Sequence, residues 1–495
     1  MLNLNKENVL SVYDHFKSEA INAFKKGNTE ASLRTIEICA KLAYEFNFFY
    51  TDSTLEKLLS EIGKSIFETN LPIKPLKGKY ALIDTNGSDN HGLTQQYIRG
   101  LIAADVEFIY IYEEIDLNRI NLILKELESY PKATVFTFDR DYSLIERIEK
   151  IIQCLLIYQP EKYIMHIMPW DVVAIVVANL INGVTRYNIN ATDHAFWLGS
   201  SCIDYSIEFR PYGYTVSLEK RGLKEEQLLM LPYYPMVNKS NFKGFPVSIP
   251  TDAIKIFSGG SFYKIYGEKG LYFDIVRTIL IENPTAVLLY AGTGNDTNML
   301  QFIKANQLEN RVFLLGNRSD IMEVFENCDI YLGTYPIAGG LMSQYAAMAK
   351  KPILAYTDPK FTTNFLESFV CHQSKQNITH TNLIDFYHHA QQLCTNPEYR
   401  IEEGNKLENC VISSDIFNME LNQLLLNNSS SRPIFKEKID YDSFSNLYLE
   451  VENSFQPSAQ LLTALNLKLK LAYKFPKIFI NVIWIVMKKV IHKRK

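Results

Sequence analysis

Two stretches of this chain alternate short apolar runs with amphipathic segments, and a cluster of prolines separates them. The second stretch is the more regular, and its apolar runs of strand length are Ile254–Ser258, Ala286–Ala291, Val312–Leu315, Ile330–Gly333 and Pro352–Tyr356. The segments between these runs have helical spacing, which predicts helices at Tyr272–Glu282, Asn298–Asn306, Ile321–Glu326 and Met342–Ala349. Such alternation predicts a parallel sheet with right-handed crossovers.

The first stretch shows the same alternation over residues 76–245. Its predicted strands are Tyr80–Asp84, Phe108–Tyr112, Thr134–Phe138 and Lys162–Ile167. Between the two stretches, prolines accumulate at positions 232, 235, 246 and 250, which is the composition of a linker. The fold class is therefore predicted as α/β, with two Rossmann-like, doubly wound domains.

Helical segments are expected to flank these domains. Residues 1–75 show helical periodicity on both sides of a Gly27-Asn28 turn. They are expected to form either a tetratricopeptide-like hairpin or a helical cap on the next domain. The sugar-nucleotide domain is expected at 246–390, a helical closing segment at 391–455, and a basic amphipathic tail at 456–495.

Composition excludes several classes of protein. A chain of 495 residues is too long for one core, and its formal charge of −4 argues against a nucleic-acid partner. The seven cysteines form no CxxC pair, which indicates reduced thiols rather than a zinc site or a disulfide framework. The N-terminus lacks a secretory signal, and no apolar run reaches the length that spans a bilayer. We therefore expect a cytoplasmic protein.

Small residues follow several strands of the second stretch, where parallel sheets bind their ligands. These loops are Ser258-Gly259-Gly260-Ser261, Gly292-Thr293-Gly294, Gly316-Asn317-Arg318 and Pro336-Ile337-Ala338-Gly339-Gly340. Glycines let a diphosphate approach the backbone, and Lys264 lies within one turn of the first loop. The pattern predicts an anion site, although a solvated lysine and a purely structural glycine turn are the alternatives.

In this order, the segments IKIFSGGSFYK, AVLLYAGTGND and NRVFLLGNRSDIMEVFENCDIYLGTYPIAGGLMSQYAAMAKKPILAY resemble the donor half of a GT-B glycosyltransferase. The resemblance implies that the nucleotide base lies against Gly316, Asn317 and Arg318. It implies that the diphosphate meets the loop Gly259–Ser261, Lys264 and the helix start at Gly339–Ser343. The donor-binding residues expected on this basis are Gly259, Gly260, Ser261, Lys264, Gly292, Gly316, Asn317, Arg318, Gly339, Gly340, Leu341, Met342 and Ser343.

One departure from the family concerns two glutamates that many retaining enzymes of this fold carry. The corresponding positions are Ala338 and Ala346. The GGLMSQYA variant looks more like cytoplasmic protein glycosyltransferases and O-GlcNAc transferase relatives, so we expect inversion of configuration. The pairs Asp139/Asp141 and Asp440/Asp442 match a DxD spacing that arises often by chance, so we expect no metal and no cofactor.

An inverting transfer needs a general base for the acceptor hydroxyl. His91 follows the loop after the first predicted strand, and Asp193-His194 lies in ATDHAFWLGSS, which resembles a cleft-facing stretch of the same glycosyltransferases. A structural histidine is the alternative at both places. Glu208, Arg210 and Tyr212 are expected to line the rim of the same cleft.

The tail after Glu452 contains nine cations and no acidic residue. Its apolar run Ile478–Met487 is flanked by lysines, which is typical of a helix lying on an anionic membrane, and a final helix folded across the domains is the alternative. We therefore expect a peripheral enzyme on the inner face of the cytoplasmic membrane. It would move sugar from a nucleotide-diphosphate sugar to a lipid-linked cell-surface glycan. Protein glycosylation, sugar-nucleotide epimerisation and a non-catalytic scaffold remain as alternatives.

Overall fold

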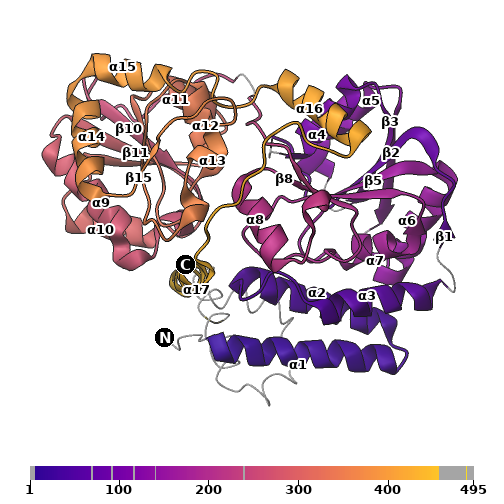
Figure 1. Ribbon diagram of the computed structural model, residues 1–495. Helices are drawn as coiled ribbons and strands as arrows, with labels where there is room; N and C mark the ends of the chain where they lie inside the picture. The colour runs from indigo at the N-terminus through magenta and orange to yellow at the C-terminus, as the bar shows by residue number, and fades with distance from the viewer. Residues whose placement is uncertain are drawn as a thin grey trace.

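The chain folds into two α/β lobes that lie side by side, with three helices beneath the N-terminal lobe (Figure 1). The computed structural model describes residues 6–67, 71–90, 93–114, 117–139, 141–237, 240–455 and residue 487. His91 and the tail at 456–495, apart from the exposed Met487, lie outside the described residues.

The N-terminal lobe is built on a seven-stranded sheet in the order β4-β3-β2-β5-β7-β8-β9, in which every pair of neighbours is parallel. Its strands are β2 (Leu76–Asp84), β3 (Glu107–Glu114), β4 (Ala133–Asp139), β5 (Pro160–His166), β7 (Thr185–Ile189), β8 (Tyr205–Glu208) and β9 (Leu228–Met230). The helices between them are α4 (Leu93–Ala103), α5 (Asn121–Glu128), α6 (Leu144–Tyr158), α7 (Val172–Leu180) and α8 (Pro211–Lys220). The four strands predicted from sequence are confirmed. Strands β7 (TRYNI) and β8 (YSIE) were missed because polar residues interrupt their apolar runs, and the three-residue β9 was missed as well.

The C-terminal lobe has a six-stranded parallel sheet in the order β12-β11-β10-β13-β14-β15. Its strands are β10 (Ile254–Gly259), β11 (Ala286–Ala291), β12 (Val312–Gly316), β13 (Ile330–Leu332), β14 (Ile353–Tyr356) and β15 (Thr379–His380). Its helices are α9 (Leu271–Glu282), α10 (Thr297–Ala305), α11 (Ile321–Glu326), α12 (Gly340–Met348), α13 (Glu367–Val370), α14 (Leu383–Thr395) and α15 (Pro397–Asn405). The five predicted strands are confirmed, and α14 runs past residue 390.

Two later helices return toward the N-terminal lobe (Figure 1). Helix α16 (Ser414–Asn427) packs on α4, where Leu421 approaches Gly100. Helix α17 (Tyr441–Phe455) contacts both α2 and the short helix η3 (Phe262–Ile265) of the C-terminal lobe. These two crossings tie the lobes together on opposite sides of the molecule.

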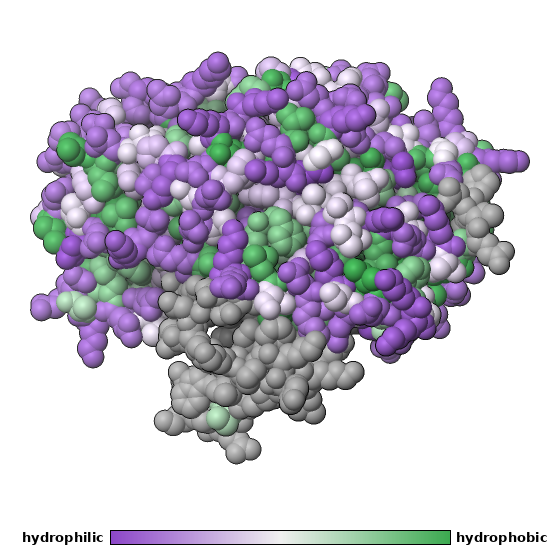
Figure 2. All heavy atoms as spheres, turned by 60° about the horizontal axis from the view of Figure 1, so that its bottom comes forward, coloured by the Kyte–Doolittle hydropathy of each residue, from purple (hydrophilic) through white to green (hydrophobic). Residues whose placement is uncertain are grey.

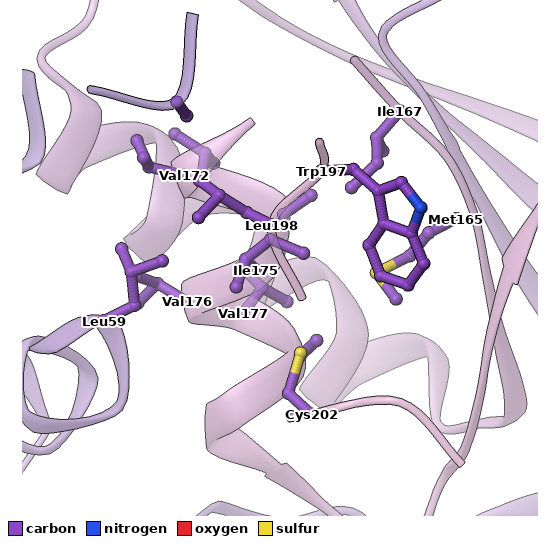
Figure 3. Packing of buried hydrophobic residues seen from close by; sticks show 14 of the residues in the cluster. Leu59, Met165, Ile167, Val172, Ile175, Val176, Val177, Trp197, Leu198 and Cys202 are labelled. Carbon is purple, nitrogen blue, oxygen red and sulfur yellow. The ribbon is translucent and has the colours of Figure 1, made fainter. Parts of the chain in front are cut away.

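The N-terminal helices form an additional layer on the face of the lobe that carries α6 and α7. They are α1 (Lys6–Lys25), α2 (Thr29–Phe46) and α3 (Ser53–Ile66), and a short β1 (Leu71–Pro72) pairs with β6 (Ile181–Asn182). Every residue of α7 except Asn179 is buried, because this apolar helix lies between the sheet and α3. Figure 3 shows its valines beside Leu59 and Leu198. Helices α1, α2 and α3 therefore share a core with the first sheet.

One face of the molecule has the surface of an ordinary globular chain. The face in Figure 2 is mostly hydrophilic, with apolar residues scattered in small groups. Among the helices of the described residues, none combines the length and the hydropathy of a membrane-spanning segment.

Candidate functional site

Three glycine-containing loops follow neighbouring strands of the C-terminal lobe and are hydrogen-bonded to one another. The Gly260 amide donates to the Ala291 carbonyl (2.9 Å), and the Gly292 amide donates to the Gly316 carbonyl (3.0 Å). Backbones approach this closely only because side chains are absent: a Cβ on Gly292 would overlap the Gly260 carbonyl oxygen. Gly259, Gly260, Gly292 and Gly316 therefore lie at one edge of the sheet, where its strands end.

Replacing Gly292 by alanine is expected to destabilise the protein by about 1–3 kcal/mol, because the added methyl group must push the first two loops apart. Urea unfolding of the purified variant measures this loss. Gly339→Ala is the matched control at the same edge, since its Cβ would meet side-chain atoms and no backbone, the closest at 3.3 Å. We expect the control to stay within about 0.5 kcal/mol of the parent protein. Equal stabilities of the two variants would show that the loops separate freely.

Lys264 lies on η3, directly after the first glycine loop. Its ammonium group donates to the Ala338 carbonyl (3.4 Å), and its Cδ lies 3.3 Å from the position of a Cβ on Gly260. Burial lowers the pKa of Lys264 below its ordinary value. Among the described residues, no carboxylate pairs with this half-buried cation. Such an arrangement favours an anion as the missing partner.

The loop before α12 lies against Lys264. The Ile337 amide donates to the Lys264 carbonyl (3.1 Å), and the buried Asn364 fixes the same loop by accepting from the Ala338 amide (3.1 Å) and donating to the Pro336 carbonyl (2.6 Å). Helix α12 then begins at Gly340 with no side-chain cap. Uncapped amides at a helix start attract negative charge, so this end of α12 and Lys264 present the same sign to one place.

The remaining predicted donor residues have distinct placements. Leu341 and Met342 are half-buried, and the Met342 methyl group lies 3.1 Å from a Cβ built on Gly259. Ser343 is fully buried, and its hydroxyl donates to the Gly339 carbonyl (3.0 Å). The half-buried Ser261 precedes η3. Whether these residues touch a donor stays a prediction.

The third loop has one exposed and one engaged side chain. Asn317 is exposed, whereas the Arg318 guanidinium forms an ion pair with Asp320 (2.5 Å) and donates to the Gly244 carbonyl (2.9 Å). Arg318 therefore holds the linker between the lobes against the end of β12. Its predicted contact with a nucleotide base stays a prediction, and in this structure the guanidinium already has partners.

In the N-terminal lobe, Asp193 and His194 follow β7, and Arg210 follows β8. Asp193 is 1% exposed and accepts from Arg210 at Oδ2 (2.5 Å) and Oδ1 (3.0 Å), and His194 Nδ1 lies 3.4 Å from the same Oδ1. Arg210 and His194 hold the pKa of Asp193 well below its usual range, against the opposing effect of burial. The His194 side chain is 33% exposed and borders Phe444 and Tyr448 of α17. An ionised aspartate thus orients a solvent-accessible imidazole.

Arg210 also joins the two lobes. Its guanidinium donates to the carbonyl of Thr363 (2.7 Å) and to the Thr363 hydroxyl (3.2 Å), both in the C-terminal lobe. Thr363 precedes Asn364, the residue that shapes the loop beside Lys264. A continuous chain of contacts therefore runs from Asp193 to the glycine loops. Sequence reasoning missed Thr363 and Asn364, because nothing in the local pattern FTTNF marks them.

Two residues that were expected on the rim of the cleft lie in the interior of the lobe instead. Glu208 and Tyr212 are fully buried, so their expected place on the rim is wrong. The Glu208 carboxylate accepts from three side chains inside the lobe.

The two DxD matches have local structural roles. Asp440 accepts from the Ser443 amide near the start of α17, and Asp139 accepts from the Asp141 amide. Among the described residues, no three His, Cys, Asp or Glu side chains gather as metal ligands would.

Glu437 lies on the segment that leads to α17 and was also missed by the sequence reasoning. Its amide donates to the Thr215 hydroxyl (2.9 Å), and its carboxyl is close enough to Arg210 and Asp193 for each to influence its charge. Burial raises the pKa of Glu437 to about 7, although Arg210 opposes the shift.

This raised pKa predicts a pH dependence of stability. The folded protein holds the Glu437 proton more tightly than the unfolded chain, whose glutamates titrate near about 4.3, so the free energy of unfolding falls as pH rises from there toward 7. We expect Glu437→Gln to remove part of that fall, which makes the variant more stable than the parent at pH 8 but not at pH 4. Urea unfolding across this range measures both slopes. The exposed Glu226, replaced in the same way, is the control that leaves the slope unchanged.

Comparison with known proteins places this architecture. No known family and no curated protein matches the chain by sequence. The solved structure of a mutant O-GlcNAc transferase from Thermobaculum terrenum superimposes with a TM-score of 0.52 at 13% identity, covering 89% of this chain and 85% of that one. A mutant of S. aureus TarM, solved with fondaparinux, alpha-GlcNAc-glycerol and UDP, gives 0.50 at 11% identity, covering 71% of this chain and all of that one. The chain therefore has the two-domain GT-B fold.

Proposed function

We propose that this chain, which has the GT-B fold, transfers a sugar from a nucleotide-diphosphate sugar to a glycan acceptor. The observation that carries the proposal is Lys264, a half-buried cation without a carboxylate partner among the described residues. It faces the loop that begins an uncapped helix. A diphosphate supplies the negative charge that such a place lacks.

The chemistry assigned to the site is a single displacement with inversion. His194 accepts the proton of the acceptor hydroxyl, whose oxygen forms a bond to the anomeric carbon while the bond from that carbon to the diphosphate oxygen breaks. The nucleoside diphosphate leaves with the bonding electrons, and Lys264 and the start of α12 stabilise its charge. Asp193 holds the imidazole in position. No step in this scheme uses a metal ion.

A binding and turnover experiment tests the proposal. The full-length protein is titrated calorimetrically with UDP-, GDP- and dTDP-sugars, and released nucleoside diphosphate is then followed with and without EDTA. We expect at least one donor to bind and to be turned over at the same rate with EDTA. A chain that binds no nucleotide would be a scaffold, and conversion of the donor sugar without acceptor would identify an epimerase. Either result would overturn the proposal.

We further propose that the acceptor is a lipid-linked glycan at the inner face of the cytoplasmic membrane. The support is the tail beyond Glu452, in which nine cations accompany an apolar run without any acidic residue. Mass spectrometry of the lipid and protein fractions from cells that produce the chain separates this acceptor from a protein acceptor. Only one fraction should gain a hexose or hexosamine.

Deleting residues 457–495 is expected to abolish binding to anionic vesicles, because the cationic apolar tail is lost. Co-sedimentation with phosphatidylglycerol vesicles measures the effect, and phosphatidylcholine vesicles are the control for charge. A truncated protein that still sediments with the anionic vesicles would assign membrane binding to another surface. Donor binding should be unchanged, since the sites described above precede the tail.

A further inference from the structure

A small crevice opens at the carboxyl ends of β5 and β7, beside the loop that carries Asp193 and His194. Its lining includes Met168, Asn188, Asn190, Thr192 and Trp197. The space available to a water-sized group is about 10 Å³, which is enough for one such group. We call this crevice the notch.

Two buried polar atoms on residues that line the notch have no partner in the described part of the chain. They are Oδ1 of Asn190, a residue 2% exposed, and Nε1 of Trp197, a residue 3% exposed. The side-chain nitrogen of Asn190 donates to Glu208 (2.7 Å), so the unpaired atom of this side chain is its oxygen, which is an acceptor. Figure 3 shows the Trp197 indole beside Met165 and Ile167, whose side chains offer it no strong acceptor.

One unpaired donor and one unpaired acceptor define the chemistry of the occupant. A buried donor or acceptor without a partner carries an uncompensated desolvation penalty, so a ligand that pairs with both atoms gains affinity. A hydroxyl group meets both needs because it accepts and donates at one atom. A carboxylate offers no donor for Asn190, and an ammonium group offers no acceptor for Trp197.

The surroundings indicate what kind of molecule would carry this hydroxyl. Met168 also lines a larger crevice of about 250 Å³, which lies along the ends of β2 to β5. Residues lining that crevice include Thr85, Arg147 and Trp170, which offer polar groups and an aromatic ring. A polyhydroxylated molecule bound along this edge would place one group in the notch, beside the loop of His194.

We infer that the notch binds one hydroxyl group of the acceptor glycan, a hydroxyl other than the one that attacks the donor. The bound oxygen accepts from Trp197 Nε1 and donates to Asn190 Oδ1. The inference rests on the proposed function for the word acceptor, whereas the notch and its two unpaired atoms are independent of Lys264. Recognition of the acceptor is thereby separated in space from recognition of the diphosphate.

The indole signals of the tryptophans test the inference directly. The chain has three tryptophans, so a ¹⁵N-labelled full-length sample gives three indole resonances, and Trp197→Phe identifies the relevant one. The probes are the methyl glycosides of glucose, galactose and N-acetylglucosamine, with their fully O-methylated forms as controls. We expect at least one free glycoside to shift the Trp197 resonance saturably, and its O-methylated form to leave the resonance unchanged. A resonance unmoved by all free glycosides, as for a trapped water only, overturns the inference, as does an equal shift by the O-methylated form.

Two further measurements keep the result interpretable. If Trp197→Phe fails to fold, Trp170→Phe and Trp484→Phe assign the same resonance by elimination. Calorimetric titration with nucleotide sugars is performed on the same samples, because it reports donor binding separately from the indole resonance. A glycoside-dependent shift without nucleotide-sugar binding would preserve the notch and refute the proposed function. The opposite pattern would preserve the function and refute the notch.

Discussion

Replacing Lys264 by alanine is expected to lower kcat/KM for the nucleotide-sugar donor by about 10²–10³-fold. The magnitude follows from the loss of one preorganised group that stabilises developing charge in a partly desolvated site. Released nucleoside diphosphate, measured over a range of donor concentrations, gives the value. Lys304→Ala removes an exposed lysine from α10 in the same lobe and should leave kcat/KM unchanged.

The stability of the Lys264 variant separates a lost function from a lost fold. The cation is desolvated and has no carboxylate partner among the described residues, so its removal relieves a cost in the ligand-free protein. We therefore expect Lys264→Ala to unfold at the same urea concentration as the parent or a higher one. Unchanged turnover in this variant would contradict the role assigned to Lys264. Lower turnover together with lower stability would assign it a structural role instead.

Replacing Arg210 by methionine is expected to destabilise the protein by about 3–5 kcal/mol, the largest stability effect that we predict. Arg210 is 3% exposed and pairs with an aspartate that is 1% exposed, so the substitution removes the ion-pair partner of a buried charge. It also removes the two hydrogen bonds to Thr363 that join the lobes. Urea unfolding followed by both fluorescence and circular dichroism measures the loss.

An exposed ion pair provides the matched control for Arg210. Arg277 pairs with Asp274 on the surface of α9 (2.9 Å), and Arg277→Met should cost less than about 1 kcal/mol. The double variant Asp193→Asn/Arg210→Met should recover part of the stability, because it removes both buried charges. If the two arginine variants lose the same amount, the buried pair between Asp193 and Arg210 stabilises the fold no more than an exposed ion pair does. If the double variant is no better than Arg210→Met, the loss comes from the contacts with Thr363.

The Asp193 carboxyl adds an acid-sensitive component to this interaction. Its folded-state pKa lies below the value of about 3.9 in an unfolded chain, so its stabilising contribution is present above that pH and is lost as pH falls through the folded-state value. The pKa of Glu437 is shifted upward, whereas that of Asp193 is shifted downward. The two carboxyls beside Arg210 therefore change stability in separate pH ranges.

The sequence alone predicted most of the scaffold. Apolar runs such as Ala286–Ala291 are buried on both faces of a parallel sheet, so the local pattern is sufficient to find them. The Gly27-Asn28 turn was also found correctly, because Asn28 caps α2 and Gly27 adopts a positive φ of 76°. The same local patterns placed the glycine loops at the ends of strands. Because the strands are parallel, those ends lie on one edge of the sheet.

Only the tertiary structure decided which side chains face each other. The contact between Arg210 and Thr363 joins residues 153 positions apart, and no local pattern encodes a pair at that separation. The engagement of Arg318 with the linker and the full burial of Glu208 likewise depend on packing between distant segments. The physical reason is that hydrophobic periodicity indicates which residues of a segment are buried and which face the solvent. Ion pairs, unpaired atoms and raised pKa values depend on which segments the completed fold brings together.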